Sequence, residues 1–389
     1  MKSLLIEGWR FLPHSYAAVN QWQCLELLRR GSVKLFFNDL PPCAAHWKQQ
    51  RGLFSEEEEK QLAEIPPPPE CGAGVDAVLR MGFPYDLAPS PFASTFVFGT
   101  CEFGAVNGSM LMPGQELAQA LATSDVNIIT PSNWSSFGFI RSGAPAERVH
   151  VVPHGVNTGI FHPLPESSRE ALRRELGWDS RFVFLHIGAM TENKGIKPML
   201  KAFASIARKH KSATLVLKGL DALYSSREVL SGLLSGHLDK EEVEEIGPRI
   251  IYLGETMSFL EIAALHQAAD AYLAPYHAEG FNLPVLEAAA CGLPSICTAG
   301  GPTDDFTTSE FCLRIESRVE RVPDSWGGGG GQRIYLVPLF SKLCELMERA
   351  ICDADLRRVS RQAGPAHVEA HYTWAKVVDI LLRELRLES

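Results

Sequence analysis

The sequence has few features of a membrane or secreted protein. No stretch approaches the roughly 20 consecutive apolar residues that a membrane-spanning helix needs. The start, MKSLLIEGWRF, has an apolar run that is too short for a signal peptide. The nine cysteines are scattered and no pair has CxxC spacing, which predicts reduced thiols. We therefore expect a cytoplasmic protein whose contact with a membrane, if any, is peripheral and at its inner face.

Positive charge is also scarce. Lys and Arg total 37 against 46 Asp and Glu, which gives a formal net charge of -9. Binding to nucleic acid depends on clustered cations, so no nucleic-acid partner is predicted. The twelve histidines show no metal-ligand spacing, and no metal or other cofactor is predicted from them. An anionic ligand would have to be held by a local arrangement of groups.

Short apolar strands alternate with amphipathic helices along both halves of the chain, which is the pattern of doubly wound parallel sheets. In the second half, Phe182–Ile187 is almost continuously apolar, as strands are when helices cover both faces of a sheet. We predict an α/β protein with two Rossmann-like domains, at residues 1–163 and 164–365, followed by a C-terminal helix within 366–389.

Two helix starts are marked by capping residues. Ser55 with Glu58 three positions later is a capping-box pattern, which predicts a helix over 55–64. Thr373 is a good N-cap for an amphipathic helix over 373–387.

The segment YHAEGFNLPVLE, residues 276–287, is the most informative part of the chain. Proline is favoured at the first helical position, so Pro284 predicts a short helix from Pro284 to about Cys291. A helix N-terminus presents unpaired N–H groups and partial positive charge, which suits a pyrophosphate. The backbone of residues 280–283 (Gly280, Phe281, Asn282 and Leu283) is therefore a candidate phosphate site.

Two carboxylates flank this predicted helix start. A carboxylate beside a phosphate repels it unless it reaches past the phosphate to hydrogen-bond donors, such as sugar hydroxyls. We assign Glu287 to the ribose hydroxyls and Glu279 to the transferred sugar. The alternative is that Glu287 only complements the helix dipole and that Glu279 is a surface loop residue.

Two lysines follow predicted strands at the same sheet edge. Lys194 closes the loop after Phe182–Ile187, and Lys218 follows the next strand. The carboxyl edge of a parallel sheet is the usual ligand edge, so both ammonium groups can point at a phosphate. The alternative is that both are ordinary solvated lysines.

Together, these segments resemble the retaining glycosyltransferases of the GT-B fold known as glycosyl transferases group 1, which share a glutamate–seven–glutamate motif. The resemblance extends to PSNW at 131–134, to VPHGVN at 152–157 and to Gly300-Gly301. It implies two domains facing a cleft, with the donor bound by the second domain and the acceptor by the first. It also implies a metal-independent transfer that retains configuration, with Glu279 and Lys194 as the catalytic groups.

The resemblance implies a nucleotide-sugar donor, with UDP-sugar favoured, and a saccharide or lipid-linked acceptor, as in polysaccharide biosynthesis. Two departures affect the site. Ala189 stands where the family usually has an arginine, and we hypothesise that Lys218 takes over its charge. The loop after the first strand lacks the usual glycines, so Gly8 and Glu102 are the acceptor-side candidates.

Other signals carry less weight. Residues 72–77 match a GxGxxA fingerprint, but prolines precede it and a strand pattern follows, which argues against a dehydrogenase. Asp353-Ala354-Asp355 is interpreted as helix capping and not as a metal motif. Two alternatives to a transferase stay open: a GT-B-fold epimerase and a pseudoenzyme that binds nucleotide-sugar.

Overall fold

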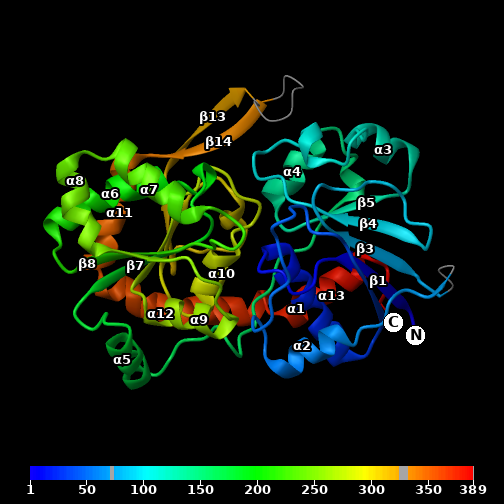
Figure 1. Ribbon diagram of the computed structural model, residues 1–389, viewed down its shortest axis with the longest axis horizontal. Helices are drawn as coiled ribbons and strands as arrows, with labels where there is room; N and C mark the ends of the chain where they lie inside the picture. Colours follow the sequence, from blue (N-terminus) through cyan, green and yellow to red (C-terminus); the bar gives the residue numbers. More distant parts are fainter. Residues whose placement is uncertain (71–73, 324–331, 389) are drawn as a thin grey trace. The chain divides into compact units, whose positions relative to one another are not determined.

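The computed structural model describes residues 1–70, 74–323 and 332–388. The chain forms two compact units. Unit 1 is Met1–Gly155, Arg321–Ile334 and Tyr372–Ser389, and unit 2 is Val156–Glu320 and Tyr335–His371. Both are built on a six-stranded parallel sheet with interleaved helices, so the predicted pair of doubly wound α/β domains is confirmed (Figure 1).

Unit 1 has the strand order β2-β1-β3-β4-β5-β6. Its strands are β1 (Ser3–Gly8), β2 (Lys34–Asp39), β3 (Ala77–Met81), β4 (Ser94–Phe98), β5 (Asn127–Thr130) and β6 (Val149–Val151). Its helices are α1 (Ser15–Arg30), α2 (Glu56–Ala63), α3 (Leu117–Thr123), α4 (Asn133–Arg141) and α13 (Trp374–Glu384), with short 3-10 helices at Gly108–Met110 and Ala146–Arg148. Strands β1 and β3 are buried along their whole length.

Unit 2 has the strand order β12-β11-β10-β7-β8-β9. Its strands are β7 (Phe182–Ile187), β8 (Ala213–Lys218), β9 (Ile250–Leu253), β10 (Ala271–Ala274), β11 (Ser295–Thr298) and β12 (Cys312–Ile315). Its helices are α5 (Glu166–Glu175), α6 (Ile196–Lys209), α7 (Ser226–His237), α8 (Lys240–Ile246), α9 (Phe259–Ala268), α10 (Leu283–Ala290), α11 (Phe340–Cys352) and α12 (Ala354–His371). Short 3-10 helices lie at Glu192–Lys194, Gly247–Arg249 and Pro302–Asp305. Strand β13 (Ser317–Pro323) pairs with β14 (Gln332–Pro338) in a separate two-stranded sheet, whose residues are divided between the two units.

The predicted helix starts agree with the structure. Ser55 and Glu58 form both hydrogen bonds of a capping box at the start of α2. The Thr373 side chain accepts a hydrogen bond from the backbone N–H of Lys376 at the start of α13.

The domain boundaries differ from the predicted ones. The compact units divide at Gly155 and Val156, whereas we predicted residue 163, and α13 belongs to unit 1. A Cβ atom on Gly155 would lie 2.9 Å from the Trp374 side chain, so the start of α13 packs directly against the chain that follows β6. Arg30 of α1 also forms an ion pair with Asp379 of α13 at 2.5 Å. These contacts between distant segments explain why the last helix joins the first unit.

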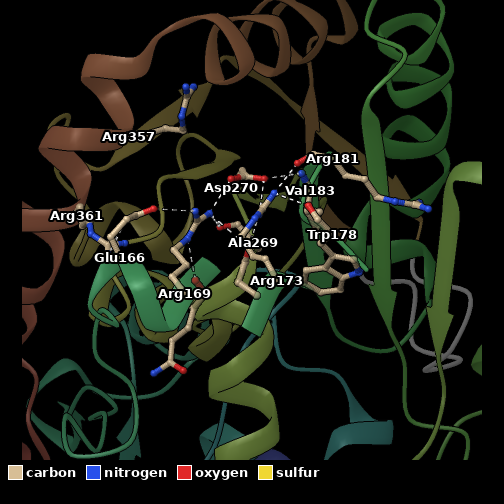
Figure 2. Close-up of polar contacts among 12 residues, drawn as sticks. Glu166, Arg169, Arg173, Trp178, Arg181, Val183, Ala269, Asp270, Arg357 and Arg361 are labelled. Carbon is tan, nitrogen blue, oxygen red and sulfur yellow. Dashed lines mark hydrogen bonds and ion pairs between the residues drawn. The ribbon is translucent and has the colours of Figure 1, made fainter. Parts of the chain in front are cut away.

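In unit 2, an arginine cluster fixes α5 to the amino edge of the sheet (Figure 2). Asp270, at the start of β10, accepts hydrogen bonds from Arg169 at 2.7 Å and Arg173 at 2.9 Å. It also accepts one from the backbone N–H of Val183 at 2.8 Å, which links β10 to β7. Arg173 further donates to the Ala268 carbonyl at the end of α9. The cluster holds together the two strands whose opposite ends carry the candidate site.

Candidate functional site

The strand order of the unit 2 sheet changes direction between β7 and β10, which makes this position the switch point of the sheet. From β7 the chain proceeds through β8 and β9 on one side, and from β10 through β11 and β12 on the other. Ligands of open α/β sheets bind at the carboxyl ends of the strands at such a switch point. His186 lies there, at the end of β7, and its Nδ1 is 2.8 Å from the Leu273 carbonyl of β10.

Backbone hydrogen bonds hold the loops after β7 and β10 together. The backbone N–H groups of His277 and Ala278 donate to the Asn193 carbonyl at 2.7 and 3.2 Å. Between the two loops, Gly195 has a φ of +70°, and a Cβ atom there would lie 1.9 Å from the Pro275 carbonyl oxygen. Only glycine fits this position, because both the left-handed backbone and the close approach exclude a side chain.

This arrangement brings together two side chains that the sequence marked separately. Lys194 Nζ donates to Glu279 Oε1 at 2.6 Å, and Asn282 Nδ2 donates to the same oxygen at 3.2 Å. The Glu279 side chain is 6% exposed and that of Lys194 is 21% exposed. A nearly buried carboxylate is thus balanced by one cation and one amide, and it is not the surface loop residue of the alternative interpretation.

The predicted short helix is α10, which begins at Leu283 and ends at Ala290, one residue earlier than predicted at each end. Its N-cap is Asn282, a non-glycine residue in the left-handed region with a φ of 77°. Strained backbone of this kind is concentrated at functional sites. A Cβ atom on Gly364 of α12 would lie 2.4 Å from the Ala289 carbonyl, so α12 packs closely behind α10. Because α10 follows the loop that leaves the carboxyl end of β10, its positive end lies at the carboxyl edge of the sheet, where it can interact with an anion.

Glu287 lies further along α10 and is 7% exposed. Its Oε2 is 3.6 Å from Nε2 of His266 on α9. Neither ring nitrogen of His266 has a hydrogen-bond partner within the described part of the chain. The assignment of Glu287 to ribose hydroxyls stays a prediction.

The structure does not join Lys218 to the Lys194–Glu279 pair. Its Nζ donates to the carbonyls of Gly219 and of Glu255, the latter at 2.7 Å, so it ties together the chain after β8 and β9. Burial lowers the pKa of Lys218, while Glu255 and Asp221 act in the opposite direction. To contact a phosphate in place of the arginine absent at Ala189, this ammonium would have to leave at least one carbonyl. Its role as a replacement stays a prediction.

His186 is a site residue that the sequence analysis missed. Burial lowers its pKa to about 4, so the ring is neutral at neutral pH. Its bond to the Leu273 carbonyl places the proton on Nδ1, and Nε2 has no hydrogen-bond partner among residues 1–70, 74–323 and 332–388. The available signal was a single polar residue inside the apolar run of β7.

The two acceptor-side candidates lie in unit 1. Gly8 ends β1, and a Cβ atom there would lie 2.7 Å from the Asn20 amide nitrogen, so a larger residue would require the Asn20 side chain to shift. Glu102 lies in the loop after β4, and its carbonyl accepts a hydrogen bond from Trp134 Nε1 at 2.9 Å. Nothing in these contacts tests a role in acceptor binding.

The other motifs considered in the sequence can now be compared with the structure. Asp353 accepts a hydrogen bond from the Leu356 N–H at 2.9 Å, which agrees with helix capping. Residues 72 and 73 of the dehydrogenase-like fingerprint lie outside the described residues. Within those residues, no cluster of three or more His, Cys, Asp or Glu side chains could hold a metal ion. None of the described helices has the length and apolar character required to span a membrane.

Residues 168–312 match the family described as Glycosyl transferases group 1. A D-inositol 3-phosphate glycosyltransferase of Kineococcus radiotolerans is 30% identical over 252 residues, which is 63% of this chain and 53% of that protein. An alpha-galactosylglucosyldiacylglycerol synthase of Streptococcus pneumoniae is 27% identical over 156 residues, 40% of this chain and 39% of that protein. The match thus spans about half or less of these relatives' own length.

Among solved structures, Anabaena Alr3699/HepE in complex with UDP and glucose superposes with a TM-score of 0.70 at 14% sequence identity. The superposition covers 99% of this chain and 100% of that chain. At this identity the likeness concerns the fold, which is the two-sheet architecture derived above.

Proposed function

From the premise that this chain carries a glycosyl transferases group 1 domain on a GT-B fold, we propose that it is a retaining glycosyltransferase. The donor is a nucleotide-sugar, with UDP-sugar favoured, and the acceptor is a saccharide or a lipid-linked saccharide. The observation that carries the proposal is the Lys194–Glu279 pair at the switch point of the unit 2 sheet, next to the N-terminus of α10.

The groups of this site complement a sugar diphosphate. Lys194 and the positive end of α10 offer positive charge to the diphosphate, and they stabilise the negative charge that develops as the glycosidic bond to phosphate breaks. Glu279 can accept hydrogen bonds from sugar hydroxyls, and its pairing with Lys194 reduces its repulsion of the phosphate. Because these groups belong to the protein, the proposed transfer does not depend on a divalent metal.

Retention follows from front-face attack in this proposal. The acceptor hydroxyl approaches from the side of the leaving phosphate, which takes up its proton, and the protein contributes positioning and electrostatic stabilisation. Glu279 is then a binding and stabilising group and not a covalent nucleophile.

The test is a transfer reaction with UDP-glucose and a panel of saccharide acceptors, with product configuration determined by proton NMR. We expect an α-linked product, UDP release, and an unchanged rate in excess EDTA. A β-linked product would contradict retention, and inhibition by EDTA would contradict metal independence. Nucleotide binding without turnover would favour the pseudoenzyme, and an isomerised nucleotide-sugar formed without acceptor would favour the epimerase.

A further inference from the structure

Unit 1 has its own switch point. From β1 the chain passes to β2 on one side, whereas β3, β4, β5 and β6 extend the sheet on the other. The carboxyl ends of β1 and β3 therefore border the position at which open α/β sheets bind ligands. The loop that leaves β1 here contains Phe11, a non-glycine residue with a φ of 59°. Left-handed backbone is unfavourable at such a residue, and strain of this kind is concentrated at functional sites.

The loop ends at His14, which is the N-cap of α1. Its Nδ1 accepts a hydrogen bond from the Tyr16 N–H at 3.2 Å. Nδ1 must therefore carry the lone pair, and in the neutral ring the proton is on Nε2. Burial lowers the pKa of His14 to about 4, so the neutral form is present at neutral pH. Within the part of the chain that the structure describes, no group accepts a hydrogen bond from this Nε2–H.

Aromatic rings surround His14. The ring centroids of Trp9, Trp47 and Tyr16 lie 5.3, 5.0 and 5.3 Å from that of His14. Trp9 and Trp47 are buried, whereas His14 and Tyr16 are half-buried and keep part of their surface accessible. The result is an aromatic surface with one oriented N–H donor.

Hydroxyl groups adjoin this surface. The Tyr16 hydroxyl lies 3.0 Å from both the Tyr85 hydroxyl and Thr100 Oγ1. Glu102, two residues after Thr100, is close enough for its charge to contribute to raising the pKa of Tyr16, which is raised chiefly by burial. The acceptor-side candidate Glu102 therefore belongs to the same region as His14.

The electrostatics favour a ligand that presents oxygen atoms. Helix α1 has 16 residues and no acidic side chain of its own in its first turn, so its positive end is available to oxygen atoms nearby. Aromatic surfaces with a few oriented polar groups are typical of small-molecule sites. A ring with hydroxyl oxygens, which offers an apolar face and hydrogen-bond acceptors, fits this combination.

We propose that His14 binds the sugar acceptor, with Nε2–H donating a hydrogen bond to an acceptor oxygen while the sugar ring lies against Tyr16. That the bound sugar is the acceptor of a transfer reaction rests on the function proposed above. The site itself rests on the contacts of unit 1 alone. His14 then contributes to selecting the acceptor, in addition to capping α1.

Two substitutions separate these roles. His14→Asn places an oxygen near the position of Nδ1, which keeps the cap, but has nothing near the position of Nε2. His14→Gln places an amide nitrogen near the position of Nε2 but loses the capping atom. If His14 binds sugar, His14→Asn weakens sugar binding although it is the more stable variant. If His14 is only a cap, His14→Gln is the more damaged variant in every assay.

Binding is measured by saturation-transfer NMR with methyl α-glucoside, methyl α-mannoside, myo-inositol and glucose 6-phosphate, and by calorimetry with UDP on the same samples. We expect at least one sugar to bind, about tenfold weaker binding to His14→Asn, and binding to His14→Gln within about threefold of the parent. UDP affinity should be the same in all three proteins.

Equal sugar binding by His14→Asn and the parent would overturn the proposal, as would no sugar binding to any sample. Displacement of the sugar by inorganic phosphate at equal concentration would also overturn it, because the site would then recognise an anion. Absence of UDP binding alongside normal sugar binding would count against the UDP-sugar donor proposed above and leave the sugar site standing.

Discussion

Removal of the Lys194 ammonium tests how unit 2 holds its buried carboxylate. In the structure Glu279 is 6% exposed and is held by Lys194 at 2.6 Å and by Asn282 at 3.2 Å. Lys194→Ala leaves this carboxylate with the amide alone. Exposed ion pairs contribute about 0–1 kcal/mol, whereas loss of one partner from a buried pair destabilises by about 3–5 kcal/mol. With Lys194 21% exposed, we expect an intermediate loss of about 2 kcal/mol.

This loss should be visible in thermal unfolding. For domains of about 150–250 residues, 1 kcal/mol lowers the midpoint by about 2–4 °C, so Lys194→Ala should lower the midpoint of unit 2 by about 4–8 °C. The double variant Lys194→Met with Glu279→Gln should lose less than Lys194→Ala, because no uncompensated charge remains.

Lys211→Ala is the matched control. Lys211 pairs with Glu245 at 3.0 Å, but its side chain is 65% exposed, and we expect no measurable change in midpoint. The reasoning is refuted if Lys194→Ala melts like the parent protein, or if the effects of Lys194→Met and Glu279→Gln simply add.

Three further predictions concern unfolding. Gly195→Ala should lower the unfolding temperature of unit 2 markedly more than Gly177→Ala. Both glycines have a φ near +70°, but only at Gly195 would a Cβ atom collide with a carbonyl oxygen. Equal circular-dichroism melts of the two variants would contradict this. Asp270→Ala should lower the midpoint while UDP affinity stays unchanged, because it leaves the buried Arg173 without its carboxylate at the amino edge of the sheet; calorimetry with UDP checks the second part. Burial lowers the pKa of His186 to about 4 from a usual value of 6.5, so the unfolded chain binds more protons between these values and stability should fall as the pH drops through that range. His186→Phe should reduce this acid sensitivity in urea titrations at pH 4.5 and 7, and an unchanged pH dependence would exclude this histidine as a cause.

Local sequence patterns were sufficient for much of the fold. The capping box at Ser55 and the N-cap at Thr373 depend only on neighbouring residues, and both form as predicted. Pro284 marks the start of α10 to within one residue for the same reason. The return of α13 to unit 1 was missed, because the packing of Trp374 on Gly155 joins positions more than 200 residues apart.

The candidate site was predictable only in part. Lys194 and Glu279 could be singled out because each follows a strand at one sheet edge, but the 2.6 Å contact between them depends on the loops that Gly195 allows to meet. The hydrogen bonds of Lys218 to two carbonyls depend on the path of the chain after β8 and β9, which no local pattern specifies. The same holds for the tautomer of His186, which is set by the Leu273 carbonyl of β10, and for the contact between the rings of His14 and Trp47.

The central claim is that the switch point of unit 2 binds a nucleoside diphosphate sugar. It is tested most directly by thermal unfolding of the parent protein, Lys194→Ala and Glu287→Ala with UDP, GDP, ADP and their glucose derivatives. A ligand that binds only the folded state raises the midpoint. We predict a raised midpoint for the parent with one nucleotide, UDP being favoured, and its loss in both variants. No shift with any nucleotide, or a shift that both variants retain, would contradict the account.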